Sequence, residues 1–150
     1  MQKILVSACL LGEIVRYDGK KVAPLSSLLT LWHSQQRLIS FCPEVGGGLS
    51  VPRLPAEQQA NGEIITISGI NVSAAFQQGA QQALQLCVQH NIRFAVLKEF
   101  SPSCGSQTIY DGSFSGKKIS GQGLTTQLLR QHNIEVFSEF TINKLAEKLL

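Results

Sequence analysis

The sequence predicts an α/β fold: a three-layer α/β/α sandwich around a Rossmann-like, mostly parallel sheet, with a small β-ribbon excursion. Four short apolar runs rich in β-branched residues are separated by segments with helical character. Strands that alternate with helices in this way form parallel sheets with right-handed crossovers. The length of 150 residues is enough to bury one core without disulfides, so we expect a single domain over residues 1–150.

The first half of the chain contains a strand, a helix, a second strand and a ribbon. In chain order, these elements are predicted in KILVSAC (3–9), PLSSLLTLWHSQQ (24–36), RLISFC (37–42) and GEIITISGINVS (62–73). Short apolar runs that end in turn residues are typical of buried strands. The last segment lies outside the strand–helix alternation, so we expect it to form the β-ribbon.

The second half of the chain returns to a regular alternation of helices and strands. In chain order, a long helix, a strand, a helix, a strand and a final helix are predicted over 72–91, 93–99, 123–133, 134–139 and 141–150. The long helix carries an apolar stripe that includes Phe76, Ala80 and Cys87. Asn133 is suited to a left-handed helix end, and Thr141 is suited to an N-cap.

The composition excludes several classes of protein. Hydrophobic residues make up 43% of the chain and charged residues 15%, which is too apolar for a disordered protein. The net charge of +3 comes from scattered Lys and Arg residues, which argues against binding to large nucleic acids and is compatible with a small polar ligand. Nothing in the sequence indicates an oligomeric state.

The amino terminus does not match an export signal. Only Ile4, Leu5 and Val6 precede Ser7, whereas a signal peptide has an apolar region of roughly 7–15 residues. No run approaches the roughly 20 residues that span a membrane. We therefore expect a cytoplasmic protein without a membrane partner, in which the four cysteines stay reduced.

Three of the four cysteines follow predicted strands. Cys9 follows the first strand, Cys42 the second and Cys104 the third, whereas Cys87 lies on the apolar stripe of the long helix and is expected in the core. In open α/β sheets, ligands bind outside the carboxyl ends of the strands. The sequence therefore predicts that three thiols meet at one edge of the sheet.

Several uses of these three thiols remain open from the residues alone. Each thiol, taken singly, also suits a small core residue. Together they could hold zinc, although no CxxC pair is present. They could also hold an iron–sulfur cluster, which usually has four thiolate ligands, so that three would leave one iron open. The spacing does not choose between iron and zinc.

A carboxylate and three glycines follow the second of these thiols. Glu44 comes two residues after Cys42, and it is our candidate for a general base. Gly46, Gly47 and Gly48 come next, and we expect them to let the backbone bend tightly around a bound group. The glycines match neither a GxGxxG motif nor a P-loop, which argues against a nucleotide-phosphate site.

Six motifs, spread over nearly the whole chain, resemble those of the thiouracil desulfidase family. They are SACLLG (7–12), VRYDG (15–19), CPEVGGGLSVPR (42–53), LKEFSPSCG (97–105), IYDGSFSGK (109–117) and GQGLTTQLL (121–129). The chain departs from the family's Asp-Val-Thr pattern at Asn71 and Ser73.

The resemblance implies an enzyme and a cofactor. It implies a 4Fe–4S cluster held by Cys9, Cys42 and Cys104, with one iron left open. It also implies hydrolytic, non-redox removal of sulfur from thiouracil or a related thiolated pyrimidine, giving uracil and hydrogen sulfide. An open iron would polarise the carbon–sulfur bond as a Lewis acid. In the same reading Glu44 is the catalytic base and Ser101 orients the attacking water.

Three further residues are weaker candidates for substrate binding. Ser103 flanks the proline next to Ser101, and Tyr110 and Arg16 lie in or beside the two Tyr-Asp-Gly sequences. Asp-Gly pairs are common in turns, so a purely structural role competes with this prediction.

Two other functions remain open beside the desulfidase. A non-catalytic iron–sulfur or zinc protein, acting as a sensor or carrier, would need a fourth protein ligand such as Cys87. A hydrolase with zinc on the same three thiolates is the other possibility, and metal analysis would distinguish it.

Overall fold

A parallel four-stranded sheet forms the centre of the computed structural model, which describes residues 1–12, 17–19 and 26–150. Its strands lie in the order β2-β1-β5-β8. Their bounds are Ile4–Ser7 for β1, Leu38–Phe41 for β2, Phe94–Leu97 for β5 and Glu135–Ser138 for β8. These are the four runs predicted as strands, so the predicted sheet is confirmed.

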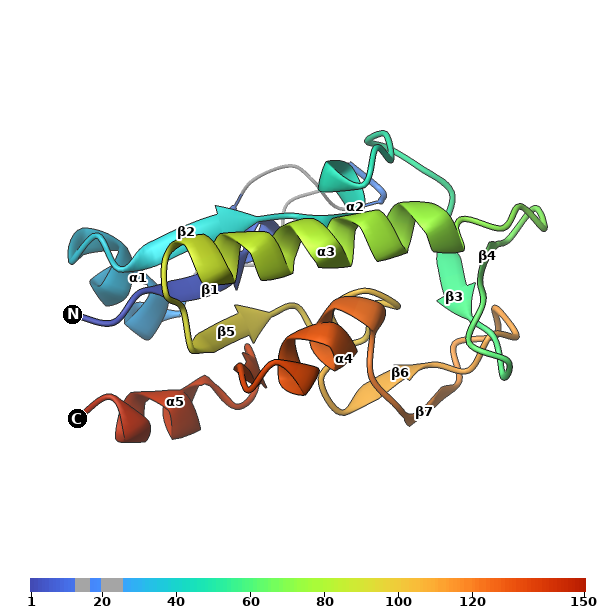
Figure 1. Cartoon of the computed structure of the whole chain (residues 1–150). Coiled ribbons are helices and arrows are strands. Elements are labelled where there is room, and N and C mark those ends of the chain that lie inside the picture. The colour runs from blue at the N-terminus through green and yellow to red at the C-terminus, as the bar shows by residue number, and fades with distance from the viewer. Residues whose placement is uncertain (13–16, 20–25) are drawn as a thin grey trace.

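Helices cover both faces of the sheet, as the predicted three-layer sandwich requires (Figure 1). Successive strand residues point to opposite faces. One face forms a buried cluster with α1 (Ser27–Ser34) and α5 (Ile142–Lys148), and its members include Ile4, Val6, Val96, Leu29, Trp32, Ile142 and Leu145. The other face packs against α3 (Ser73–Gln89) and α4 (Leu124–Gln131) through Leu5, Ala95, Leu97, Ala83, Cys87 and Leu129. The fold class is confirmed.

The helix ends follow local capping rules. Ser26 caps α1, because its side chain accepts a hydrogen bond from Leu29 N at 3.1 Å. Asn133 has φ 62°, the left-handed end predicted after α4. Thr141 stands at the N-cap of α5 as predicted, but its Oγ1 accepts a hydrogen bond from Ser138 N at 2.9 Å and makes no capping bond to the helix.

Two small antiparallel ribbons extend from the carboxyl end of the sheet. The first pairs β3 (Ala56–Gln58) with β4 (Ile64–Thr66), and the second pairs β6 (Thr108–Tyr110) with β7 (Lys118–Ser120). The segment 62–73, predicted as the ribbon, contains only β4. Its partner β3 and both strands of the second ribbon were not predicted, because three-residue strands carry too little alternation to be recognised. Glu57 joins the two ribbons, because its Oε1 accepts hydrogen bonds from Gly112 N at 2.9 Å and Phe114 N at 3.2 Å.

Within the described ranges, every helix is too short or too polar to cross a membrane.

Candidate functional site at the carboxyl edge of the sheet

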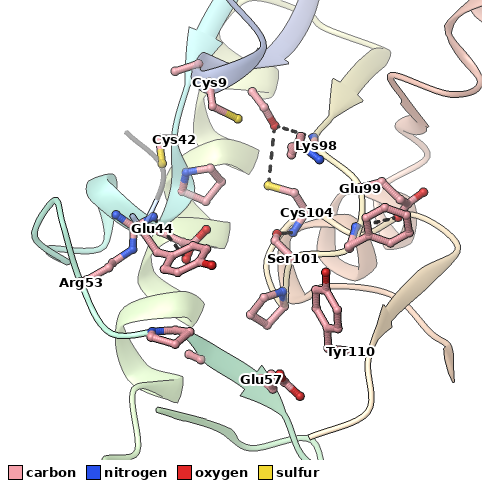
Figure 2. Close-up of a pocket in the computed structure, with 18 residues that line it drawn as sticks. Cys9, Cys42, Glu44, Arg53, Glu57, Lys98, Glu99, Ser101, Cys104 and Tyr110 are labelled. Atoms are coloured by element: carbon pink, nitrogen blue, oxygen red, sulfur yellow. Dashed lines mark hydrogen bonds and ion pairs between the residues drawn. The ribbon is translucent and has the colours of Figure 1, made fainter. Parts of the chain in front are cut away.

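A cavity of about 280 Å³ lies at the carboxyl ends of β1, β2 and β5. Its size is close to the lower end of the range for small-molecule sites, roughly 300–1,000 Å³. The three predicted thiols, Cys9, Cys42 and Cys104, all line it, and Glu44 and Ser101 line it with them (Figure 2). All four cysteines of the chain are free thiols. Segments far apart in the sequence therefore contribute to one small site.

Cys9 lies in the turn that ends the first strand. After Ser7, the last residue of β1, the chain forms a 3₁₀ turn, η1 (Ala8–Leu11). Gly12 ends this turn in a left-handed conformation, and its N–H donates to the carbonyl oxygens of Ala8 and Cys9. The Cys9 side chain is 9% exposed. The thiol is therefore desolvated at the floor of the site.

Cys42 and Glu44 are placed by a single-turn helix, α2 (Pro43–Gly46). Cys42 is its N-cap residue, and Glu44 lies in its first turn. The Glu44 side chain is 19% exposed, and its Oε1 lies 3.4 Å from Arg53 Nη2, a guanidinium that is itself 8% exposed. Arg53 is anchored in turn, because its Nη1 donates a hydrogen bond to Ser50 O at 3.0 Å. A largely buried ion pair thus holds the carboxylate at the cavity wall.

The glycines after Glu44 lie close to α3. Of the three, only Gly48 has a left-handed backbone, with φ 98°. A Cβ on Gly47 would collide with the carbonyl oxygen of Ala75 in α3, and a Cβ on Gly79 in α3 would collide with that of Pro43. Gly47 and Gly79 therefore allow α2 to lie directly against α3.

Cys104 is held by hydrogen bonds to its backbone as well as by packing. Its N–H donates to Ser101 Oγ at 2.7 Å, and its carbonyl accepts from Thr126 Oγ1 in α4 at 3.0 Å. Cys104 is 4% exposed. The Ser101 hydroxyl therefore stabilises the turn that carries the thiol, while its own hydrogen is still available to donate toward the cavity.

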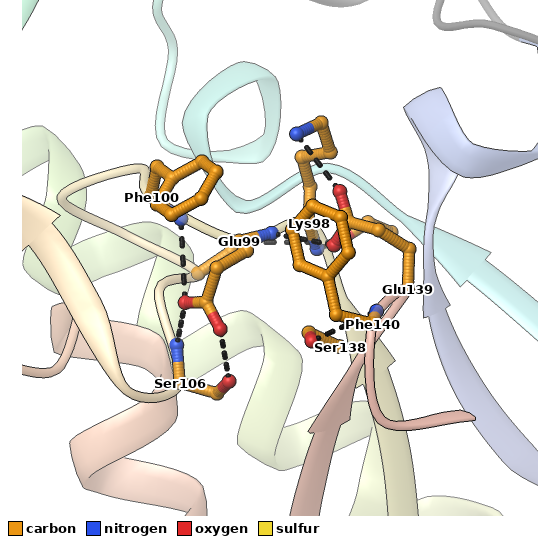
Figure 3. A network of polar contacts seen from close by, with 9 residues as sticks. Lys98, Glu99, Phe100, Ser106, Ser138, Glu139 and Phe140 are labelled. Carbon is orange, nitrogen blue, oxygen red and sulfur yellow. Dashed lines mark hydrogen bonds and ion pairs between the residues drawn. The ribbon is translucent and has the colours of Figure 1, made fainter. Parts of the chain in front are cut away.

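A buried carboxylate that the sequence analysis missed organises the loop between β5 and β6. Glu99 accepts hydrogen bonds from Ser106 N at 2.5 Å, Ser106 Oγ at 2.6 Å, and the N–H groups of Phe100 and Gln107, each at 3.3 Å (Figure 3). Burial raises the pKa of Glu99, but these hydrogen bonds outweigh it and the net pKa is lowered. The carboxylate is therefore ionised and serves as the centre around which the loop folds.

The same loop is tied to the strand beside it. Glu139, just after β8, accepts a hydrogen bond from Glu99 N at 2.8 Å, and its other oxygen lies 2.8 Å from Lys98 Nζ (Figure 3). Phe100 has φ 76°, which is rare for a bulky residue and costs backbone energy. In the sequence, the Glu99-centred loop is marked only by a glutamate that is followed by small polar residues.

Burial keeps the site's thiols protonated in the absence of a positive charge. Desolvation raises the pKa of Cys9 to about 12, and the neighbouring Cys42 thiol adds to the effect. Desolvation also raises the pKa of Cys42 and, with the help of Glu44, that of Cys104. The pKa of Glu44 is raised by burial too, although the Arg53 guanidinium opposes the shift. Such a cluster of desolvated acids favours a bound group that carries positive charge.

The weaker substrate-binding candidates are placed differently by the structure. Tyr110 lines the cavity from β6 (Figure 2). Ser103 does not line it: the residue is fully buried, and its hydroxyl is 2.8 Å from Thr125 Oγ1 in α4. Arg16 lies outside the described residues.

The donor set at the cavity suits a cluster better than a single ion. Thiolates are soft ligands that select iron–sulfur clusters, zinc and copper(I). In the part of the chain that the structure describes, no group of three or more His, Cys, Asp or Glu side chains is arranged to hold one metal ion. The ligands of a cluster bind different irons and need not converge on one point. Three thiols on the walls of one cavity therefore fit a cluster, and Cys87, buried among α3 core residues, is not part of this set.

Asn71 and Ser73, both singled out in the sequence, connect the first ribbon to α3. Asn71 Oδ1 accepts a hydrogen bond from Ser73 N at 2.9 Å, and Ser73 Oγ accepts one from Ile64 N at 2.9 Å. Their side chains therefore still supply the polar contacts of a helix entry.

A family model, a curated protein and a solved structure match this chain over almost its whole length. A family model described as 2-thiouracil desulfurase matches residues 4–141. The uncharacterized protein YbbK of Bacillus subtilis is 41% identical over 151 residues, covering 95% of this chain and 99% of its own. Among solved structures, the [4Fe-4S]-dependent thiouracil desulfidase TudS superimposes with a TM-score of 0.96. It is 52% identical, with 99% of this chain and 98% of that chain covered.

Proposed function

The chain belongs to the 2-thiouracil desulfurase family, and from this premise we propose that it is a [4Fe–4S]-dependent desulfidase that converts thiouracil to uracil and hydrogen sulfide. We further propose that Cys9, Cys42 and Cys104 hold the cluster. The observation that carries this proposal is the meeting of these three thiols, from the ends of three strands, in one small cavity beside a buried carboxylate.

The ligand count matters for the chemistry. A 4Fe–4S cluster usually has four thiolate ligands, so three leave one iron without a protein ligand. When bound, the cluster would supply an open Lewis-acidic iron that attracts and polarises the soft thiocarbonyl sulfur. The overall reaction adds water to the carbon and releases hydrogen sulfide, so no electron acceptor or donor is needed.

Glu44 and Ser101 supply the proton chemistry in this proposal. The Glu44 carboxylate takes a proton from the attacking water, for which its low exposure and its fixed position beside Arg53 suit it. Ser101 accepts the Cys104 N–H through its oxygen, so its own hydrogen can donate to the water and orient it toward the substrate. Tyr110 and the first ribbon form the opposite wall, where the pyrimidine ring would lie.

The alternative of a non-catalytic iron–sulfur or zinc carrier has no structural support. It would need a fourth protein ligand, and Cys87 is 1% exposed in the core between α3 and the sheet, away from the cavity.

The test is anaerobic reconstitution of the wild-type protein, followed by iron and sulfide analysis. We expect about four irons per chain, loss of the 4-thiouracil absorbance and release of sulfide. Cys104→Ala should bind little iron and be inactive, whereas Cys87→Ala, the matched control, should retain both iron and activity. A fully loaded wild-type protein that leaves every thiolated pyrimidine unchanged would refute the assignment.

A further inference from the structure

The Ser7 hydroxyl donates a hydrogen bond to the sulfur of a proposed cluster ligand, Cys104. Its Oγ lies 3.7 Å from Cys104 Sγ, a contact drawn as the dashed line that reaches Cys104 in Figure 2. The two residues are 97 positions apart in the sequence. Ser7 is 3% exposed, so bulk water does not compete for its hydroxyl.

A second contact occupies one lone pair of the Ser7 hydroxyl. The backbone N–H of Lys98 donates to Ser7 Oγ at 2.9 Å. A serine hydroxyl has one hydrogen and two lone pairs, and a backbone N–H can only donate. Lys98 therefore uses one lone pair of the oxygen and leaves the single hydrogen of Ser7 free. A cluster ligand is a thiolate, which can only accept, so this hydrogen would point at the sulfur.

The sheet holds this donor in place. Ser7 is the last residue of β1, and β1 pairs with β5 as far as Val96, two residues before Lys98. Beyond the last paired residues of the two strands, the Ser7 side chain accepts the backbone N–H of Lys98. Both ends of the contact are thus attached to rigid elements, because Cys104 is itself held by Ser101 and Thr126.

From these contacts we infer that Ser7 is a positioning residue that donates a hydrogen bond to the Cys104 ligand and thereby tunes the electron density of the cluster. This inference rests on the proposed function. A donor to a ligand sulfur withdraws electron density from it, and such bonds are among the features that set the reduction potential of iron–sulfur clusters. The same withdrawal makes the open iron a better acceptor for the thiocarbonyl sulfur.

The test compares reduction potentials of anaerobically reconstituted variants. Removing the donor in Ser7→Ala should make the potential more negative, because the more electron-rich reduced state loses its stabilising hydrogen bond. Ser7→Thr keeps a hydroxyl and should lie close to the wild type. Ser138→Ala is the matched control: Ser138 is also fully buried at the end of a sheet strand and also accepts a backbone N–H, that of Phe140 at 3.1 Å. Its potential should equal that of the wild type.

A loaded Ser7→Ala protein with the wild-type potential would overturn the inference and leave the proposed function intact. A wild-type protein that takes up no cluster would instead refute the proposed function, and this inference with it. If Ser7→Ala fails to hold iron, the inference is tested on the wild-type protein by resonance Raman spectroscopy. Its Fe–S stretching bands in the resonance Raman spectrum should shift when the protein is reconstituted in D₂O, and the absence of any shift would count against the hydroxyl donor.

Discussion

At the scale of single residues, the site combines acids whose pKa values are raised by burial with two cationic side chains, Arg53 and Lys98. The Glu44 carboxylate is the acid best placed for proton transfer, because it lines the cavity with the three thiols and contacts Arg53. Its neighbour Ser101 has a structural role that the structure shows directly, the hydrogen bond from Cys104 N. In the proposed function, the Glu44 carboxylate takes the proton, the Ser101 hydroxyl orients the water and the thiols hold the cluster.

The proposed role of Glu44 leads to a prediction for its amide variant. Glu44→Gln should lower kcat for 4-thiouracil by about 10²–10⁴-fold, because an amide cannot take a proton from water. Its iron content should match that of the wild type, since the amide oxygen can still contact Arg53. The measurement is steady-state kinetics on protein of known iron content.

The matched control is Glu135→Gln. Glu135 also forms an ion pair, 2.8 Å from Lys148 Nζ, but it lies half-exposed on the surface away from the cavity. This variant should keep its activity. A Glu44→Gln enzyme within a few-fold of wild-type kcat would exclude Glu44 as the base.

At the scale of elements, the contact between α2 and α3 positions half of the site. Gly79 lies inside a long helix, where glycine is normally unfavourable, and it is buried against Pro43, the residue between Cys42 and Glu44. Glycine in a helix interior is about 1 kcal/mol less favourable than alanine, and this cost accompanies the close approach. The benefit is that the α2 turn can lie directly on the sheet-covering helix.

Gly79→Ala tests this contact through the sign of its effect on stability. In an ordinary helix interior, alanine would stabilise by about 1 kcal/mol. Here the added Cβ meets the Pro43 backbone, so we expect destabilisation of about 1–3 kcal/mol, together with weaker iron binding. Urea denaturation of the apo protein measures it, with Gln81→Ala at an exposed position of α3 as the control. A stabilised Gly79→Ala protein would show that the contact is looser than the structure indicates.

At the scale of the whole molecule, the cavity is enclosed by parts that are far apart in the sequence. The sheet edge and α2 supply the thiols and Glu44, while the first and second ribbons supply Glu57 and Tyr110. Glu57 also fastens the two ribbons to each other through Gly112 and Phe114. A cluster bound to thiols from three distant segments would therefore cross-link the whole fold.

Cluster loading should consequently raise the melting temperature. A ligand that binds only the folded state and is present at about 100 times its Kd adds about 2.7 kcal/mol, which corresponds to roughly 5–10 °C for a chain of this length. Anaerobic thermal denaturation of the loaded and apo forms measures the shift. Cys104→Ala, compared with its own apo form, should show no such rise, and an equal rise in that variant would argue against Cys104 as a ligand.

The sequence alone supported much of this description. The four strands, the helices between them, the left-handed end at Asn133 and the order of thiols after strands were all predictable, because each depends on local periodicity and turn chemistry. The rule that ligands gather at the carboxyl ends of parallel strands then brought Cys9, Cys42 and Cys104 to one edge. Family motifs supplied the expected chemistry.

Only the tertiary structure decided how that edge is built. The partners of Ser7, Glu99 and Gly79 are backbone groups, a thiol and a serine hydroxyl, and no local sequence pattern identifies such partners in advance. Ser103 and Ser101 flank the same proline, yet one is buried against α4 and the other lines the cavity. Local sequence determines which way a segment tends to fold, whereas contacts across 97 positions exist only after the sheet has brought β1 and the Cys104 loop together.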